Sequence, residues 1–310
     1  MKVCFFGLGS IGKRHLKNFT AVAAEHGLEL EIHAYRNTRK ILEPEVQKLL
    51  HHQIYNEYDL HNDYDVVFIT NPTSMHYHTI KLLANKTKHM FIEKPVFDNI
   101  DYNIMDLNLS DQGVYYVAGP LKFASIVQGL KDIIKQEKVY SIRAICSSYL
   151  PDWRPGVDYR DVYSAKKVEG GGVSIDLIHE WDYITYLFGF PLKVHKLEGK
   201  FSHLEIDSED LAIYIARYDD KLVEIHLDYF GRTRRREIEI FTESGTIIGD
   251  FIGNKISFTN GRAAIDYSME NRDMYKEEMR SFLEQIARCA EGRDGTGHAY
   301  KVLKLAMGRL

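Results

Sequence analysis

Glu93, Lys94 and Pro95 form the segment of this sequence with the clearest capacity for chemistry. They follow the apolar run 89–92, which is typical of a buried strand. In a parallel sheet, ligands bind beyond the carboxyl ends of the strands, so Lys94 is expected beside a ligand. Pro95 stops the strand and fixes the backbone, which argues against an ordinary surface lysine. A lysine in that place can polarise a substrate oxygen or relay a proton.

A glycine-rich loop opens the chain, with the sequence Gly7-Leu8-Gly9-Ser10-Ile11-Gly12. The strand-like run 2–6 precedes it, and apolar residues recur at helical spacing after it. In this G-x-G-x-x-G pattern the glycines let the backbone approach a pyrophosphate, and the helix that follows presents its N–H groups to the phosphates. The pattern predicts dinucleotide binding by Gly7, Gly9, Ser10, Ile11 and Gly12.

The end of the second expected strand, 28–35, decides between cofactors. An acidic residue there would bind the ribose 2′-hydroxyl of NAD, but the window 34–40 contains none. Arg36 can instead stack on adenine and pair with the 2′-phosphate of NADP. We therefore expect NADP as the cofactor. NAD is the alternative, because Tyr35 and Asn37 could bind its ribose hydroxyls, and a solvated basic loop is the interpretation without function.

A histidine among carboxylates follows the three glycines 170–172. Asp176, His179 and Asp182 recur at a spacing of three, which predicts that they share one face of a helix. A histidine beside a carboxylate can act as a general base near neutral pH, and Glu180 competes with Asp176 as its partner. A polar stripe on a helix is the plain alternative. Because no second histidine or cysteine cluster accompanies these residues, we expect no metal site.

The segment 152–165 reads as a long polar and aromatic loop after a strand. Such loops often line sites for carbohydrates or other polar ligands, because aromatic faces stack and arginine pairs with anions. We expect the substrate to be bound by side chains of this loop and by one lysine, namely Lys122, Trp153, Arg154, Tyr159 and Tyr163. The basic run 232–236 is a second candidate anion site, although a solvated strand is its default interpretation.

Length and composition set the limits for these motifs. A chain of 310 residues, 45% of them apolar, is long enough for two domains with real cores. The formal net charge of −4 gives no general attraction to nucleic acid. Three widely spaced cysteines predict a reducing cytoplasm. No long apolar run is present, so we expect no membrane association.

The order of the expected elements predicts the fold class. Strand and helix patterns alternate over 1–119, which indicates an α/β Rossmann domain with a parallel sheet. Beyond residue 119 the strands alternate apolar and polar residues, which is typical of an antiparallel sheet with one packed face. We therefore expect an α+β domain over 120–310. Its strands are expected at 140–149, 193–201, 211–217, 222–229, 237–241, 246–251 and 255–258.

In combination and order, these motifs resemble the Gfo/Idh/MocA family, which includes glucose–fructose oxidoreductase and inositol dehydrogenase. The segment 7–15 resembles the family's opening, 70–76 the loop after its fourth strand, and 93–95 its best-known signature. The three glycines followed by an aspartate and a histidine resemble its active-site helix, although Asp176 here lies three rather than four residues before His179. The resemblance implies further cofactor contacts from Thr70, Asn71, Pro72, His76, Glu93 and Lys94.

The resemblance also implies a function. It points to an NAD(P)-dependent oxidoreductase acting on CH–OH groups of a small sugar, sugar-nucleotide or polyol-like substrate, with Lys94, His179 and Asp176 as catalytic residues. It implies a large, open C-terminal sheet that forms a homodimer or homotetramer. The chain also resembles a narrower branch of the family, and that resemblance implies a role in bacterial surface-sugar biosynthesis. The alternatives are a redox-neutral glycosidase or epimerase with bound NAD, and a dinucleotide-binding regulator, which would have no need of Lys94 and His179.

Overall fold

The computed structural model describes residues 1–270, 272–288 and 295–310. The chain divides into two compact units, the first made of 1–120 and 273–300 and the second of 121–272 and 301–310. The first change of unit lies next to the expected boundary after residue 119, whereas 273–300 joins the first unit. The division of roles between domains 1–119 and 120–310 stays a prediction. Cys289 lies outside the described residues.

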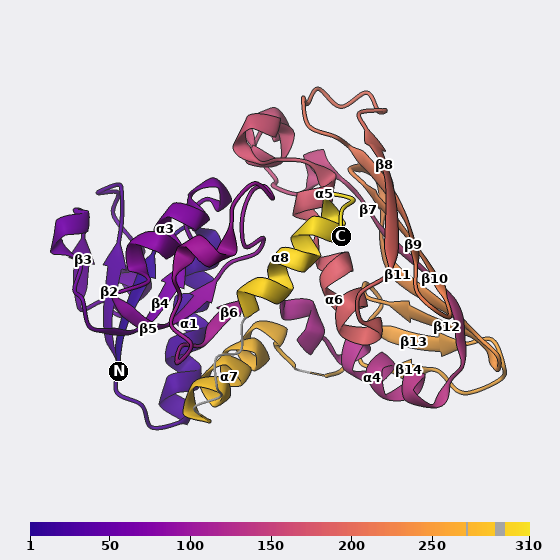
Figure 1. The fold of residues 1–310 in the computed structure, drawn as a ribbon, viewed down its shortest axis with the longest axis horizontal. Coiled ribbons are helices and arrows are strands. Elements are labelled where there is room, and N and C mark those ends of the chain that lie inside the picture. The colour runs from indigo at the N-terminus through magenta and orange to yellow at the C-terminus, as the bar shows by residue number, and fades with distance from the viewer. Residues whose placement is uncertain (271, 289–294) are drawn as a thin grey trace. The chain divides into compact units, whose positions relative to one another are not determined.

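A six-stranded sheet forms the centre of the first unit, with the strand order β3-β2-β1-β4-β5-β6 (Figure 1). Each neighbouring pair is parallel. This order is that of a Rossmann fold and confirms the expected fold class. The short edge strand β3 was not foreseen. The strands are β1 (Lys2–Phe6), β2 (Glu31–Tyr35), β3 (His52–Ile54), β4 (Tyr64–Ile69), β5 (Thr87–Ile92) and β6 (Tyr115–Val117).

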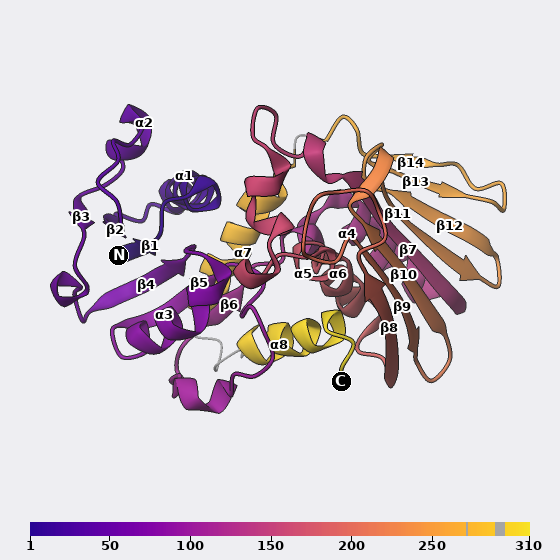
Figure 2. The same ribbon diagram turned by 90° about the horizontal axis from the view of Figure 1, so that it is seen from above.

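Helices cover both faces of this sheet, which explains why its strands are nearly continuous apolar runs. Phe19 of one helix and Phe282 of another belong to the same buried core as Phe5 and Phe68 of the strands. Figure 2 shows α1 and α3 on opposite faces of the sheet. The helices of the first unit are α1 (Ser10–Glu25), α2 (Pro44–Gln47), α3 (His76–Leu83) and α7 (Met274–Ala287).

An eight-stranded sheet forms the second unit, with the order β14-β13-β12-β11-β7-β10-β9-β8. Among the described strands of this second sheet, only β7 and β10 pair in parallel. The expectation of a mainly antiparallel sheet is therefore confirmed. The strands are β7 (Val139–Tyr149), β8 (Lys193–Gly199), β9 (Leu211–Arg217), β10 (Leu222–Asp228), β11 (Phe230–Thr242), β12 (Gly245–Asp250), β13 (Lys255–Phe258) and β14 (Ile265–Asp266).

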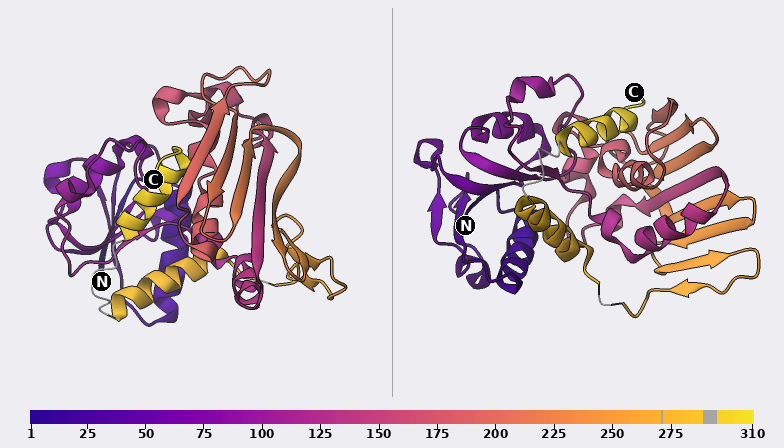
Figure 3. Two further views of the ribbon diagram at one scale, coloured as in Figure 1. Left: turned by 45° about the vertical axis from the view of Figure 1, so that its right-hand side comes forward. Right: turned by 60° about the horizontal axis from the view of Figure 1, so that its bottom comes forward.

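The two faces of this second sheet differ. Figure 3 shows helices against one face only, and along β9 the residues Ala212, Tyr214 and Ala216 are buried while Ile215 is exposed. This period of two is the pattern that the sequence displayed. The helices of this part of the chain are α4 (Ser125–Ile133), α5 (Val173–Asp176), α6 (His179–Phe188) and α8 (Gly295–Ala306).

Several connections contain short 3-10 helices rather than α-helices. They span Glu57–Asp59, Thr73–Met75, Ile104–Leu107, Pro120–Phe123, Ile134–Gln136, Leu150–Asp152, Tyr159–Asp161, Tyr163–Ala165 and Lys167–Glu169. Among the described helices, none has both the length and the apolar character needed to cross a membrane.

Candidate active site

Three of the predicted motifs meet at one edge of the parallel sheet. Phe6, Ile69 and Ile92 are register partners on β1, β4 and β5. The residues that follow them, Gly7, Thr70 and Glu93, therefore come side by side. The Thr70 N–H donates to Phe6 O at 3.1 Å and the Glu93 N–H to Ile69 O at 2.9 Å, while Thr70 Oγ1 donates to Gly7 O at 2.7 Å. The carboxyl ends of these strands thus carry the glycine loop, the 70–76 loop and the lysine turn together.

The glycine loop has the geometry of a phosphate cradle. Gly7 has φ +107°, and a Cβ there would lie 2.9 Å from the Asn71 nitrogen, so only glycine fits. At Gly9 an added Cβ would meet nothing within 4 Å, which leaves that side of the loop open. The first turn of α1 carries no acidic residue and no side-chain cap among the described residues. Its N–H groups can therefore receive a pyrophosphate, and the loop fits a dinucleotide.

A buried histidine connects this helix to the lysine turn. His15 of α1 is fully buried, and its Nε2 makes a short hydrogen bond with Glu93 Oε1. Glu93 Oε2 accepts from the Lys94 backbone N–H at 3.0 Å. Burial by itself would raise the pKa of Glu93, but the hydrogen bond to His15 and the charges of His15 and Lys94 outweigh it and lower that pKa. The sequence interpretation gave His15 no role, because its partner is distant in the chain.

A second buried histidine joins the two loops beyond β4 and β5. The ring nitrogens of His76 lie 3.0 Å from Asn71 O and 3.0 Å from Pro95 O. Asn71 Nδ2 in turn donates to Thr79 Oγ1 at 2.8 Å. His76 is therefore a positioning residue for these loops, and its predicted contact with a cofactor, like that of the exposed Pro72, stays a prediction.

Arg36 is held inside the unit. Only 8% of the residue is exposed, and its guanidinium donates to Gln53 Oε1 at 2.6 Å and to Lys40 O. Asn37 beside it is exposed. Because a guanidinium has five N–H donors, the expected pairing of Arg36 with a 2′-phosphate requires either the donors that these acceptors leave unused or a change of partner. The sequence interpretation missed them because the span 36–64 gave no clear strand.

In the second unit, the expectation of one helix through Asp176 and His179 is wrong. Helix α5 ends at Asp176, Leu177 adopts φ −97° and ψ 23°, and α6 begins at His179. Of the predicted set, only His179 and Asp182 share a continuous helix. The three glycines and the short α5 are packed tightly, since a Cβ at Gly171 would lie 2.1 Å from Tyr163 O. Periodicity could not reveal the break between the two helices, because the spacing of three residues from Asp176 to His179 is the same as that from His179 to Asp182.

The Asp176 carboxylate is buried and accepts two tyrosine hydroxyls. Tyr163 donates to Oδ1 at 2.5 Å and Tyr229 donates to Oδ2 at 2.5 Å. Burial, followed by the adjacent negative charge of Asp176, raises the pKa of both tyrosines, so they remain protonated donors at neutral pH. Tyr229 was not among the predicted site residues, because its link to Asp176 spans distant parts of the sequence.

The other two carboxylates of this segment have cationic partners. Glu180 is fully buried, and its Oε1 lies 2.8 Å from the guanidinium of Arg236 on β11. Asp182 pairs with Lys122 at 3.0 Å. Glu180 is therefore bound to the sheet through Arg236. Lys122, which was predicted to bind substrate, instead pairs with the helix that begins at His179.

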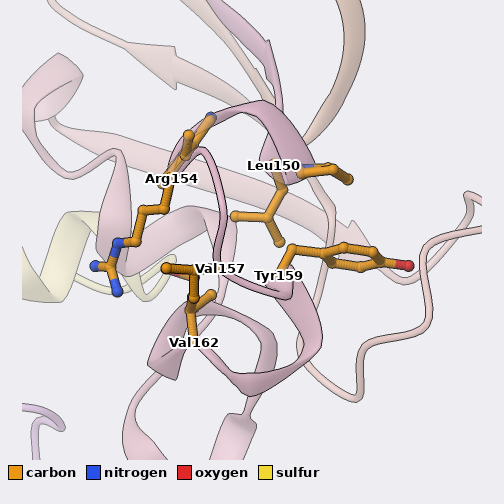
Figure 4. A pocket seen from close by; sticks show the side chains of 8 residues that line it. Leu150, Arg154, Val157, Tyr159 and Val162 are labelled. Atoms are coloured by element: carbon orange, nitrogen blue, oxygen red, sulfur yellow. The ribbon is translucent and has the colours of Figure 1, made fainter.

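The aromatic loop surrounds a small hollow, whose roughly 210 Å³ of empty space includes open solvent. In Figure 4 the Arg154 guanidinium and the Tyr159 hydroxyl point to opposite sides of the apolar group formed by Leu150, Val157 and Val162. Three of the five predicted substrate residues line it. The complete lining consists of Leu150, Pro151, Trp153, Arg154, Val157, Tyr159, Val162 and Ser164.

Two of these residues already have polar partners that fix the loop. Trp153 Nε1 donates to Ser148 Oγ at 2.9 Å, and Tyr159 Oη accepts from the Glu205 N–H at 3.1 Å. The Arg154 guanidinium lies 5.5 Å from the centroid of the Tyr163 ring, which links the hollow to the Asp176 cluster through Tyr163.

Comparison with known proteins assigns the chain to a family. Residues 1–105 match the Gfo/Idh/MocA model described as an oxidoreductase family with an NAD-binding Rossmann fold, and residues 127–248 match the C-terminal domain of the same family. The protein belongs to the Gfo/Idh/MocA family and is an oxidoreductase. The family expected from the sequence motifs is confirmed.

Individual relatives are distant but match over almost their full length. The uncharacterised oxidoreductase YrbE of Bacillus subtilis is 23% identical over 93% of this chain and 88% of that protein. Myo-inositol 2-dehydrogenase of Thermotoga maritima is 22% identical over 95% of this chain and 92% of that protein. A structure of levoglucosan dehydrogenase with NADH superposes with a TM-score of 0.85 at 16% identity, over 99% of this chain and 95% of that one, which shows a shared fold.

Proposed function

We propose that this protein transfers a hydride between a nicotinamide dinucleotide and a CH–OH carbon of a small cyclic polyol or sugar-like molecule. The observation that carries the proposal is the meeting of Gly7, Thr70 and Glu93 at one edge of the parallel sheet. That edge places a phosphate cradle next to a lysine turn. The dinucleotide, when bound, supplies the hydride acceptor or donor.

The chain's own residues supply positioning and proton movement. The ammonium of Lys94 holds and polarises the substrate oxygen, while Glu93 and His15 fix the turn that carries it. His179 exchanges the proton of that oxygen as a general base or acid. Asp176 is held by Tyr163 and Tyr229, so we assign it the role of positioning the segment that joins α5 to α6. We also assign Asp176, rather than Glu180, as the candidate partner of His179.

The proposed class of substrate is supported by the residues that line the hollow in the second unit and by the names of the relatives. Two of those relatives are named as dehydrogenases of myo-inositol and levoglucosan, which are ring compounds rich in hydroxyl groups. Trp153, Arg154 and Tyr159 line a hollow whose aromatic and guanidinium groups suit such a compound or an anionic derivative of it. A role in bacterial surface-sugar biosynthesis, and the cytoplasm as the place where the protein acts, stay predictions.

Lys94→Ala tests the proposal. Turnover of polyol and sugar alcohols, assayed with NADP+ and NAD+, should fall roughly 10²-fold or more in kcat while dinucleotide affinity changes little, because the ammonium acts on the substrate oxygen. Lys88→Ala is the matched control, since Lys88 lies on β5, the strand that precedes Lys94, and pairs with Asp65 at the surface.

An unchanged kcat in Lys94→Ala would remove Lys94 from the chemistry. Wild-type turnover without any net change in free NAD(P)H would instead favour a redox-neutral reaction. Dinucleotide binding without turnover of any substrate, together with unchanged affinity in the variant, would favour a regulator.

A further inference from the structure

Three potential metal ligands meet on β2 and β3, at the opposite end of β2 from the glycine loop. Glu31 and His33 are two residues apart on β2, so their side chains lie on the same face of the sheet. His52, the first residue of β3, is the direct register partner of His33. One ligand atom from each of Glu31, His33 and His52 lies within 4.8 Å of the other two.

The distances suit a divalent ion after a small adjustment. Glu31 Oε1 lies 2.9 Å from His33 Nε2, and the two histidine rings are perpendicular with centroids 4.9 Å apart. Ligand atoms about 2.0–2.1 Å from a tetrahedral Zn²⁺ are roughly 3.3 Å from one another. The carboxylate therefore has to move away from His33 by a few tenths of an ångström, and His52, which is exposed, can rotate towards it.

The surroundings of His33 orient it for binding through Nε2. The ring is completely buried, and its Nδ1 lies 3.1 Å from the Tyr64 hydroxyl. That hydroxyl also accepts from the His61 N–H at 3.4 Å. When Nδ1–H donates to Tyr64, the Nε2 lone pair faces Glu31 and His52. A second partner that fixes the tautomer of a histidine in this way is usual for metal ligands.

Two further side chains lie near these ligands: the ring centroid of His61 is 4.7 Å from that of His33, and the charge of Lys2 acts on Glu31. Lys2 is the nearby cation, and its ammonium is paired with Asp63 at 2.8 Å. Cys4 is the register partner of His33 on β1, but it is not among the three residues whose ligand atoms lie together. The donor set therefore consists of two imidazoles and one carboxylate, which favours zinc over magnesium or calcium.

We propose that Glu31, His33 and His52 bind one Zn²⁺ ion, with water in the fourth position. The ion would join the edge strand β3 to β2. Residue Gln53 on β3 holds the Arg36 guanidinium, so the ion would also stiffen the support of Arg36. The sequence interpretation expected no metal site because it did not foresee β3.

The test is a calorimetric titration of Zn²⁺ into chelator-treated protein that carries no polyhistidine tag. We expect one ion per chain, no binding of Mg²⁺ or Ca²⁺, and slower amide hydrogen exchange at residues 52–54 when Zn²⁺ is present. His52→Ala and Glu31→Gln should each weaken Zn²⁺ affinity about tenfold or more. His195→Ala should leave it unchanged, since His195 is likewise an exposed strand histidine, on β8.

Both changed side chains are at least partly exposed, and circular dichroism without Zn²⁺ checks that the variants fold. The absorption spectrum of the Co²⁺-substituted protein gives a second readout, because a four-coordinate site absorbs visible light much more strongly than a six-coordinate one. Absence of Zn²⁺ binding to the wild type would overturn the proposal. Equal affinity of the wild type, His52→Ala and Glu31→Gln would overturn it as well.

Discussion

Arg36 occupies the position where a Rossmann fold selects between its two dinucleotides. Its guanidinium hydrogen bonds to Gln53 and to the Lys40 carbonyl within the unit. A 2′-phosphate offers a stronger, charge-assisted acceptor than either of these neutral groups. The choice of cofactor is therefore a competition between acceptors that the same side chain can reach.

Arg36→Ala measures this competition. We expect it to weaken NADP(H) binding by about 1.5–3 kcal/mol, which is roughly one to two decades in Kd, and to leave NAD(H) affinity nearly unchanged. Calorimetric titration of both proteins with both dinucleotides is the measurement. If NADP(H) affinity is unaffected, Arg36 stays with Gln53 when the dinucleotide binds, and the predicted preference for NADP is wrong.

His89 on β5 should make folding sensitive to mild acid. Burial, and then the charge of Lys88, lowers its pKa from 6.5, and its Nδ1 accepts the Val114 N–H at 3.1 Å, which only the neutral ring can do. Below pH 6.5 the unfolded chain takes up a proton that the folded state resists, so stability is lost as the pH falls.

The urea midpoint of the wild type should therefore drop more between about pH 7.5 and about pH 5.5 than that of His89→Asn. Asparagine serves as the comparison because its side-chain oxygen can accept the same N–H without titrating. Parallel pH dependence in the two proteins would show that His89 does not contribute.

At the scale of elements, one buried ion pair attaches α6 to the sheet. Glu180 follows His179 directly in the first turn of α6, and Arg236 on β11 pairs with it at 2.8 Å. Arg236→Met leaves the Glu180 carboxylate buried without its cation, so the free energy of unfolding should fall by about 3–5 kcal/mol. Denaturant unfolding at neutral pH measures this loss.

Arg235→Met is the control for this change. The adjacent Arg235 pairs with Glu237 at 2.7 Å in an exposed position, where an ion pair contributes only about 0–1 kcal/mol. Equal effects of the two substitutions would mean that the Glu180–Arg236 pair is no more important than a surface pair.

At the scale of the whole molecule, the open sheet presents an outer face on which apolar side chains lie among charged ones, such as the exposed Arg143–Glu224 pair. No described helix covers it in Figure 3, and its exposed side chains include Leu197, Ile215, Leu222 and Phe241 on four different strands. The strand register places all four on the same side. Exposed apolar side chains gathered on one face are typical of an interface between subunits, and we propose that the chain forms a homodimer or homotetramer through this face.

Ile215→Glu tests this association. A carboxylate on this face would be buried unpaired in the oligomer, so we expect the mass measured by sedimentation or light scattering to fall to that of the monomer. Ile252→Glu is the matched control, because Ile252 has nearly the same exposure, 48% against 45% for Ile215, but lies in the turn after β12. An unchanged mass in both variants would place the interface elsewhere.

The sequence by itself determined the two sheets and most of the motifs at the Rossmann edge. Apolar runs and period-two alternation depend on burial of one or two faces, and those patterns are local, so 65–70 and 211–217 could be recognised as strands. The glycines of 7–12 are equally local, since the backbone shape that they allow depends on few neighbours. The family motifs then identified an oxidoreductase before any contact was known.

Tertiary structure decided the contacts between residues that are distant in the chain. The link from His15 to Glu93, the hydrogen bond from Tyr229 to Asp176 and the pairing of Glu180 with Arg236 join segments dozens of residues apart. The break between α5 and α6, and the pairing of β3 with β2 that brings His52 beside His33, likewise became visible only in the folded chain. Spacing along a chain fixes which face a side chain occupies, but only the folded chain fixes which partner meets it there.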